Sequence, residues 1–328
     1  MVLPEGAGER IEAKQPPDAF DWRNVNGEDW TTQIWNQEGC GSCVAFGNVA
    51  ALEALVNIEL GDPNVDPDLS EAHLFFCGCG QCCGRGWLPD EAANYIRDFG
   101  VPDEECFPYV DNNVPCENTC EDWDKRAYKI QGWTWVSNNV EAIKGALLIS
   151  PLPTTMLVYE DFEYYSGGIY EHTDPDTLGH HQVTFVGYNE EEDYWICKNS
   201  WGEDWGEDGW FRIRFGDSDI GYNTTRLFGA IEILCGECYD GEGGGPLVGG
   251  TPYRVTCDVA VPSGETLTIQ PHVRFYFGSG WKIISNGILN ANASVDDPIR
   301  LISLGDHNEM QLECKMRLKN GGEFKPGQ

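Results

Sequence analysis

The sequence predicts an α+β protein with a helix-rich half, a strand-rich half and a small all-β unit at its C-terminal end. Apolar residues recur at helical spacing over residues 43–60, whereas strand patterns dominate from about Lys129 onward. A glycine-rich stretch at 241–250 then separates a last region of alternating apolar residues. Because the chain has 328 residues, we expect more than one hydrophobic core.

The helical half is expected to begin with one long helix over residues 43–60, which Gly61 ends. Ser42 is a favourable residue to cap its start. A later helix is expected over residues 90–99, with Asp90 as its cap. From residue 129 onward the expected elements are strands, in the segments WTWV, TTMLVY, GGIY, QVTFVGY, DYWICKNS and GWFRIRF.

The C-terminal region shows a period of two in YRVTCDVAV (253–261) and MQLECKMRL (310–318), which predicts half-buried strands. The segments PSGETLTIQPHVRFYFGSG, NGILNANA and DPIRLIS resemble rungs of right-handed β-helix or short β-solenoid proteins. A plain β-sandwich is the alternative for this strand pattern. Nothing in the region points to catalysis.

The segment QEGCGSCVAF, residues 37–46, places Cys43 on the first turn of the long helix. A helix start presents unpaired N–H groups and a positive dipole end, which favour an anionic sulfur. The thiolate is the nucleophilic form of cysteine, and helix N-termini commonly depress its pKa. Gln37 lies a short loop upstream, where its amide can aim a donor at an oxyanion beside the Cys43 N–H.

This segment closely resembles the active-site segment of papain-like cysteine proteases. The resemblance implies that Cys43 is the nucleophile, Gln37 the oxyanion-hole side chain and Cys40 a structural disulfide partner. Val44 stands where the family usually has tryptophan, which removes aromatic shielding but no catalytic group. Without the resemblance, Cys43 reads as one more disulfide half in a cysteine-rich chain.

A cysteine nucleophile needs a histidine that takes its proton and later returns it to the leaving amine. In the papain-like pattern this histidine opens a strand at a fixed distance before Val-Gly-Tyr, which here selects His181. His180 then either perturbs the imidazole or contacts substrate. The remaining histidines have no such context and are expected to be ordinary surface or packing residues: His73, His172, His272 and His307.

The segment YWICKNSWGEDWGEDGWF, residues 194–211, resembles the family motif in which an asparagine orients the histidine. The resemblance makes Asn199 the orienting residue and Trp201 the indole that shields its hydrogen bond from water. A tryptophan-rich β-hairpin without catalytic role is the alternative. The order Cys, His, Asn along the chain also fits the family.

Substrate subsites are implied by the same resemblance. They fall near Trp87, Leu88 and Pro89, near Thr155, and at the residues that flank the expected catalytic histidine. These flanking residues are His180 and Gln182, of which Gln182 occupies a position often held by a small residue. The resemblance therefore predicts a main specificity pocket that is more polar or shallower than usual.

Fourteen cysteines in a chain of this size indicate an oxidising compartment. With Cys43 kept as a thiol, at least one more must be unpaired, and Cys197 within the YWICKNSW strand is the expected buried thiol. The resemblance suggests Cys40 with Cys83, or with its neighbour Cys82, and Cys77 with Cys116. Elimination then leaves four guessed pairs: Cys106–Cys120, Cys79–Cys82, Cys235–Cys238 and Cys257–Cys314.

Metal binding is the competing interpretation for two segments. A zinc or iron–sulfur site is the alternative to disulfides in CGCGQCC, residues 77–83. A second segment loosely resembles a calcium-binding loop, with Asp62, Asn64, Asp66 and Asp68 at the ligand positions. Two prolines interrupt this segment, which favours a solvated turn. No metal and no cofactor are therefore expected.

The net charge of -33 excludes nucleic acid as the default partner, because a polyanion would be repelled. Acidic residues suit solubility in salt or in an acidic surface layer, and a halophilic source fits without being established. We expect no apolar run that approaches the length of a membrane span, and no secretory signal opens the chain. We expect an extracellular or cell-surface protein whose signal and prosegment are absent from this chain.

The resemblance covers roughly Pro17 to Ile233. It implies a two-lobed papain-like peptidase domain at 18–240. Composition predicts an N-terminal arm at 1–17 and a linker at 241–250, and the strand pattern predicts a solenoid-like domain at 251–328. The expected function is a secreted cysteine endopeptidase that hydrolyses peptide bonds in peptides or proteins through a Cys–His thiolate–imidazolium pair and a thioester acyl-enzyme. The alternatives are a transpeptidase, or an inactive papain-like scaffold in a surface or self-assembling structural protein.

Overall fold

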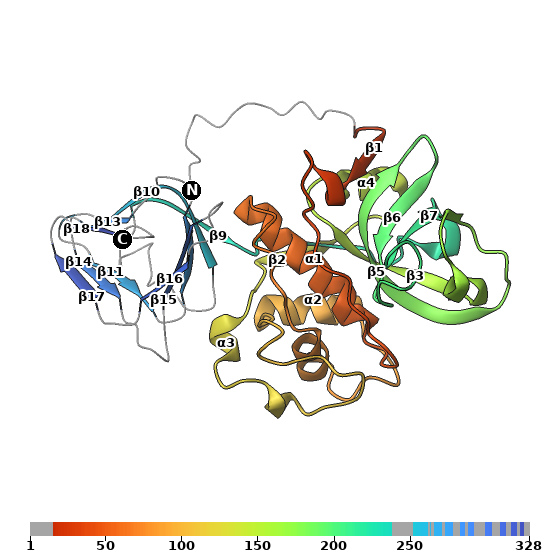
Figure 1. Cartoon of the computed structure of the whole chain (residues 1–328), viewed down its shortest axis with the longest axis horizontal. Coiled ribbons are helices and arrows are strands. Elements are labelled where there is room, and N and C mark those ends of the chain that lie inside the picture. The colour runs from red at the N-terminus through yellow and green to blue at the C-terminus, as the bar shows by residue number, and fades with distance from the viewer. Residues whose placement is uncertain are drawn as a thin grey trace.

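The computed structural model describes residues 16–237 and 252–261, and then residues 263, 266–270, 273–277, 283–285, 288–291, 299–303, 309–312, 316–319 and 322–324. Figure 1 shows three groups of elements: helices α1 to α3 lie in the middle, strands β3 to β7 on one side and strands β10 to β18 on the other. The two groups within residues 16–231 are called the helical lobe and the β lobe below.

The helical lobe is built around α1 (Cys43–Leu60), with η2 (His73–Cys77), α2 (Pro89–Asp98), η3 (Cys116–Asn118) and α3 (Trp123–Arg126) around it. Contrary to expectation, α1 is long and apolar enough to cross a membrane by length and composition. However, 83% of it is buried inside the protein, as in the core helix of a globular fold. It ends at Gly61, whose φ of 68° is left-handed.

One expected helix cap is confirmed in position only, and the other is wrong. Ser42 is the N-cap residue of α1, but its side chain makes no capping bond, because its Oγ lies 2.7 Å from the Tyr109 hydroxyl. At α2 the helix begins earlier than expected, with Leu88 as N-cap and Pro89 at the first position. Proline lacks an N–H that would need an acceptor there, so the helix starts at Pro89 and Asp90 falls in its first turn.

The β lobe is a sheet in the order β1-β5-β6-β7-β4, with β3 also paired to β5. Its core is strongly aromatic and includes Phe162, Phe185, Trp195 and Phe211. The strands are β1 (Ala19–Asp21), β3 (Leu152–Tyr159), β4 (Ile169–Tyr170), β5 (Thr177–Asn189), β6 (Tyr194–Lys198) and β7 (Trp210–Arg214).

Shorter elements complete the two lobes. Strands β2 (Gly132–Trp135) and β8 (Thr225–Phe228) form a separate antiparallel pair. The sequence analysis missed α4 (Val140–Leu147), which Asn139 caps by accepting a hydrogen bond from the Ala142 N–H. The remaining turns of 3₁₀ helix are η1 (Trp22–Asn24), η4 (Glu160–Tyr164) and η5 (Asp217–Asp219).

The C-terminal strands pair mainly in parallel. Strand β10 (Pro252–Val261) pairs in parallel with β9 (Glu232–Glu237), β12 (Arg274–Phe277) and β13 (Ile283–Ser285). Strand β9 falls in the range expected for the peptidase domain, yet its ladder partner is β10, so it belongs to the C-terminal sheets. Parallel pairs also join β11 (Thr266–Ile269) to β14 (Ile288–Ala291) and β12 to β15 (Ile299–Ser303).

The last three strands run antiparallel to their partners. These are β16 (Glu309–Leu312) on β15, β17 (Met316–Lys319) on β14, and β18 (Gly322–Phe324) on β13. Inside these sheets lies an apolar cluster that includes Tyr253, Phe275 and Phe277. The C-terminal sheets therefore have a core of their own.

The C-terminal sheets contact the helical lobe through polar and aromatic side chains. The hydroxyls of Tyr276 and Tyr128 lie 2.9 Å apart, and Arg254 donates to the Glu59 carbonyl at 2.9 Å. The guanidinium carbon of Arg274 lies 3.9 Å from the centre of the Tyr128 ring. The Arg254 contact falls on the end of α1 opposite Cys43, whereas the other two are made with Tyr128, which follows α3.

Four disulfides lie in the described part of the chain: Cys40–Cys83, Cys77–Cys116, Cys79–Cys82 and Cys106–Cys120. Every cysteine of residues 77–83 is thus in a disulfide, which leaves no thiol there for zinc or iron. Cys43 and Cys197 are free thiols. The expected pairs Cys235–Cys238 and Cys257–Cys314 lie outside the side chains that the structure describes.

Candidate active site

Cys43 is the first residue of α1, so its backbone N–H has no acceptor within the helix. Its thiol faces the backbone N–H of Gln182, in β5 of the other lobe. The junction of the lobes is close here, because a Cβ on Gly47 would lie 3.0 Å from the Gln182 side chain. The expected nucleophile therefore lies beside the strand that carries both candidate histidines.

Of these two histidines, His181 is the one that points into the junction. Successive residues of a strand point to opposite faces, and His180 is exposed whereas His181 is only 6% exposed. The His181 Nε2 atom lies 2.8 Å from Asn199 Oδ1. The His180 ring instead lies 6.0 Å from that of Tyr222, on the outer face.

The hydrogen bonds of Asn199 fix the proton on His181. Asn199 Oδ1 also accepts a hydrogen bond from the backbone N–H of Ser200 at 2.9 Å. A backbone N–H can only donate, so the Asn199 atom that faces it must be the amide oxygen. Because that same oxygen faces His181 Nε2, this nitrogen must carry the proton. Nδ1 then keeps a free lone pair and is the basic nitrogen of the ring.

Trp201 covers the His181–Asn199 pair. Its ring centre lies 5.0 Å from that of His181, and Phe162 and Trp205 pack edge-on against the indole. Asn199 is only 3% exposed. A hydrogen bond shielded in this way is electrostatically stronger than one in water.

Gln37 bridges the two lobes near Cys43. Its Oε1 accepts from Ser200 Oγ at 2.7 Å, its Nε2 donates to the Cys40 carbonyl at 2.9 Å, and its N–H donates to the Ser200 carbonyl. The serine hydroxyl fixes the orientation of the amide, so the second Nε2 hydrogen is available to an acceptor beside Cys43. Tyr109 steadies the same loop by donating to the Gln37 carbonyl.

Burial sets the pKa values of the pair. It raises the pKa of the Cys43 thiol, against the opposing effect of the N–H groups of Gln182, Val44 and Cys43 itself. It lowers the pKa of His181 to about 4, against the opposing effect of the Asn199 hydrogen bond. Both shifts favour the neutral pair in the free protein, contrary to the expected depressed thiol pKa and thiolate–imidazolium pair, because burial disfavours each charged form. His181 is therefore available as a base at neutral pH.

A buried polar network lies behind the site, and the sequence analysis missed it. Glu53 of α1 accepts from Thr32 Oγ1 and from the Leu69 N–H, while Lys198 donates to the Thr32 carbonyl and hydroxyl. Burial raises the pKa of Glu53 to about 7, although the charge of Lys198 opposes it. Two features of the sequence indicate this network: a glutamate within an apolar helix and a lysine directly before Asn199.

The expected subsite residues do not all reach an open surface. Trp87 and Leu88 line an open cavity of about 400 Å³ with Arg85 and Glu91, while Pro89 is buried at the start of α2. Thr155 pairs with Gln182 across β3 and β5, and both are almost fully buried. Gln182 packs against α1 and donates to the Val44 carbonyl, so its side chain faces the interior.

The other described histidines lie away from Cys43. His73 packs against Trp123 in the helical lobe, and His172 pairs with Asp217 on the surface of the β lobe. His272 and His307 lie outside the described residues.

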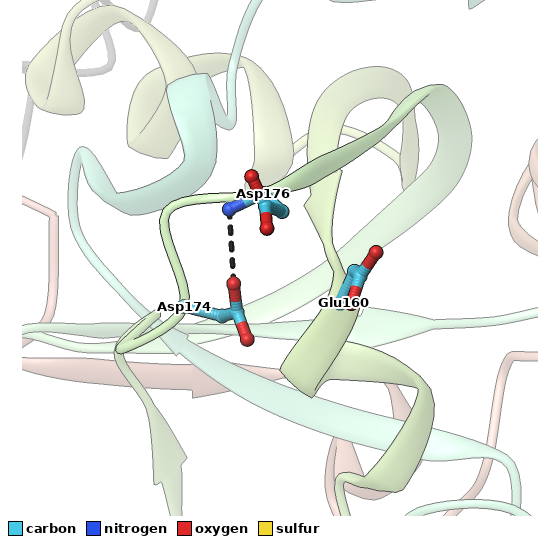
Figure 2. Close-up of side chains that lie close together, drawn as sticks. All are labelled: Glu160, Asp174 and Asp176. Carbon is cyan, nitrogen blue, oxygen red and sulfur yellow. Dashed lines mark hydrogen bonds between the residues drawn. The ribbon is translucent and has the colours of Figure 1, made fainter.

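One acidic cluster has the spacing of a possible cation site. Carboxylate oxygens of Glu160, Asp174 and Asp176 lie within 4.8 Å of one another. Figure 2 shows the three side chains. Asp174 accepts from the Asp176 N–H, which ties the loop together without a metal. At the looser calcium-like segment, Asp62 Oδ1 accepts from the Asn64 N–H, as in a turn.

A two-lobed α+β fold with Cys, His and Asn side chains at the lobe junction is the arrangement of a cysteine peptidase. The family model described as papain family cysteine protease matches residues 16–229. The chain belongs to this family and is a cysteine-type peptidase. Strands β9 to β18 lie beyond the matched range.

Individual relatives agree with this assignment. The chain is 34% identical over 245 residues to cathepsin B-like CP3 of Giardia intestinalis, covering 70% of this chain and 79% of that protein. Fruit bromelain of Ananas comosus is 31% identical over 206 residues, covering 62% and 56%.

Solved structures give the same result. The bromelain protease of Ananas comosus, in complex with the E64 inhibitor, superposes with a TM-score of 0.56 at 28% identity, covering 65% of this chain and 99% of that chain. Procathepsin B S9 of Trypanosoma congolense gives a TM-score of 0.58 at 26% identity, covering 66% and 78%.

Proposed function

We propose that the chain hydrolyses peptide bonds with Cys43 as nucleophile and His181 as general base and acid. The observation that carries this proposal is the buried hydrogen bond from His181 Nε2 to Asn199 Oδ1, which leaves Nδ1 as the base. The position of Cys43 beside Gln182, the neighbour of His181, supports the pairing.

The steps follow from these positions. His181 Nδ1 takes the thiol proton, and the Cys43 sulfur forms a bond to the substrate carbonyl carbon. The resulting oxyanion accepts hydrogen bonds from the Cys43 N–H and from the free hydrogen of Gln37 Nε2. The imidazolium then protonates the leaving amine, and the C–N bond breaks to leave a thioester. Water, deprotonated by His181, hydrolyses the thioester and restores the thiol.

An irreversible inhibitor tests the proposal. Because bromelain is known in complex with E64, we expect E64 to inactivate this protein in a one-to-one ratio and to modify Cys43. Cys43→Ala should neither cleave peptides nor react, whereas Cys197→Ala, which removes the other described thiol, should behave as wild type. Peptide cleavage by Cys43→Ala, or modification of Cys197 instead, would disprove the role of Cys43.

We expect the chain to act as an endopeptidase, which cleaves internal peptide bonds. In the sequence no histidine lies between His73 and His172, so this part of the helical lobe lacks the paired histidines that the family uses for carboxydipeptidase activity. Cleavage of a peptide library should therefore occur at internal bonds. Release of C-terminal dipeptides as the main products would contradict this mode.

We propose that Trp87 and Leu88 contact a substrate side chain, whereas the buried Thr155 shapes a subsite only from within the protein. Trp87 and the 56% exposed Leu88 support an apolar preference, since both border an open cavity. The buried Gln182 side chain is proposed to shape the substrate site beside Cys43 from within the protein, and His180 to contact substrate from the outer face. Library profiles of Leu88→Ser and Gln182→Ala test these roles, because a specificity residue alters the profile while a distant one does not.

The C-terminal strands are proposed to form a short β-solenoid. The support is their successive parallel pairing, since Tyr253 pairs with Phe275, Phe275 with Leu301 and Leu267 with Leu289. An antiparallel β-sandwich does not pair its strands in this way. We further propose that this unit attaches the peptidase to a cell surface or to another copy. Sedimentation of the full chain at rising concentration tests the second role.

An extracellular location is proposed from the disulfides. Four lie in the described residues, and disulfides persist in oxidising compartments. Recovery of the mature chain from the medium or cell wall of its source would support this location, and recovery from the cytosol would contradict it.

A further inference from the structure

The disulfide Cys79–Cys82 differs from the other three in what it constrains. It joins residues only 3 apart, whereas the others close loops with separations of 43, 39 and 14. The stabilisation that a disulfide gives the fold rises with the length of the closed loop. The same segment is already anchored at both ends, by Cys77–Cys116 and by Cys40–Cys83. Opening Cys79–Cys82 therefore costs the fold little.

The two sulfurs of this disulfide differ in access. Cys82 is fully buried, whereas Cys79 is half-buried and lines the open cavity of about 400 Å³ beside Arg85 and Trp87. A small molecule that enters this cavity reaches Cys79 and not Cys82. The volume falls within the range of about 300–1,000 Å³ that is usual for small-ligand sites.

A positively charged side chain lies next to the buried sulfur of Cys82. Arg85 Nε and Nη2 lie 3.4 Å and 3.3 Å from Cys82 Sγ. A guanidinium at this distance stabilises a thiolate, and a stabilised thiolate is a better leaving group in thiol–disulfide exchange. The charge is placed at the sulfur that leaves when Cys79 is attacked.

We propose that Cys79–Cys82 is a redox-active disulfide and that Cys79 is a site of reversible thiolation by a low-molecular-weight thiol. The incoming thiolate attacks Cys79 Sγ, the bond between Cys79 and Cys82 breaks, and the electron pair leaves on Cys82 Sγ beside Arg85. The product is a mixed disulfide on Cys79. A second molecule of the thiol can attack the small-molecule sulfur, which releases the oxidised small disulfide and leaves both cysteines reduced.

The modification would act on the substrate pocket. Trp87 packs directly on the loop, since a Cβ on Gly78 would come within 2.3 Å of its ring, and Trp87 Nε1 donates to Glu91. A group attached to Cys79 occupies the cavity that Trp87 lines. This effect rests on the proposed subsite role of Trp87, whereas the redox chemistry does not depend on any peptidase activity.

Glutathione serves as the probe for the redox step. The full chain is equilibrated in buffers of increasing reduced-to-oxidised glutathione ratio, blocked with N-ethylmaleimide and mapped by peptide mass spectrometry. We expect a range in which Cys79 carries glutathione, or Cys79 and Cys82 carry the blocking group, while the other three described disulfides stay closed. Opening of Cys79–Cys82 only together with the others, or glutathione on Cys82 instead of Cys79, would overturn the proposal.

The role of Arg85 has its own matched control. Arg85→Gln should open about threefold more slowly, because a nearby opposite charge lowers a pKa by about one unit and exchange rates follow the leaving-group pKa only in part. Arg97→Gln removes an exposed arginine of the same lobe, paired with Asp98, and should open at the wild-type rate. Equal rates in both variants would refute the assistance by Arg85.

The effect on the pocket is measured separately. KM for a peptide substrate should change across the same redox range in wild type and stay constant in the double variant Cys79→Ser/Cys82→Ser. A constant KM in wild type, with the glutathione adduct present on Cys79, would refute the link to the substrate pocket. A protein with no peptidase activity but a selective adduct would refute the proposed function and leave the redox site standing.

Discussion

Replacing Gln37 by alanine tests the oxyanion site most sharply. One of its two Nε2 hydrogens is donated to the Cys40 carbonyl, so the side chain offers a single donor to the substrate. Loss of one oxyanion donor costs about 2.7–4 kcal/mol of transition-state stabilisation, or a factor of about 10²–10³ in kcat. We expect a loss of this size in kcat for Gln37→Ala, with little change in KM.

A thiol assay separates this loss from structural damage. Alkylation of Cys43 by iodoacetamide forms no oxyanion, so Gln37→Ala should be alkylated at the wild-type rate. Ser200→Ala keeps the Gln37 donor but removes the hydroxyl that orients its amide, and should lose only about fivefold in kcat, the equivalent of one hydrogen bond of about 1 kcal/mol. A Gln37→Ala enzyme within threefold of wild type, or one whose Cys43 alkylation falls in parallel with kcat, would refute the reasoning.

Three further predictions concern pH and stability. Because burial lowers the pKa of His181 to about 4, kcat/KM should rise as pH rises through about 4; a midpoint near the ordinary histidine value of 6.5 would contradict it. Protonated Glu53 stabilises the fold fully below pH 4.5, and this contribution is lost as pH rises through its raised pKa of about 7. Urea unfolding of Glu53→Gln should therefore show a smaller loss of stability between pH 4.5 and 7 than wild type does, and an unchanged loss would contradict the burial argument. Tyr128→Phe removes the hydrogen bond between Tyr128 and Tyr276 and should lower the free energy of unfolding by about 1 kcal/mol. A variant as stable as wild type would contradict this prediction.

The parts of the site that lie in short segments were predictable from the sequence. Cys43 follows a glycine-rich turn and opens a long apolar helix, and both facts are visible in one segment of ten residues. The alternation of a strand separates His180 from His181 once the strand is recognised. The helix and the strand depend on local periodicity, which the sequence carries directly, whereas the roles of Cys43 and His181 were inferred from the resemblance to papain-like proteases.

The parts that depend on distant contacts were not predictable. The Ser42 side chain is suited to cap α1, but its hydroxyl pairs instead with the hydroxyl of Tyr109, 67 residues away. The bridge between Glu53 and Lys198 passes through Thr32, so it joins three segments that only the folded chain brings together. Strand β9 pairs with β10 across the glycine-rich stretch, and composition alone gave no sign of this pairing.

Trapping of the acyl-enzyme tests the central claim most directly. The protein is mixed with an ester substrate at mildly acidic pH, quenched, and analysed by intact-mass measurement and peptide mapping. We predict one acyl group per chain, bound to Cys43 in wild type, and much slower formation of the same adduct in His181→Ala. An acyl group on any other residue, or equal rates of acylation with and without His181, would contradict the account.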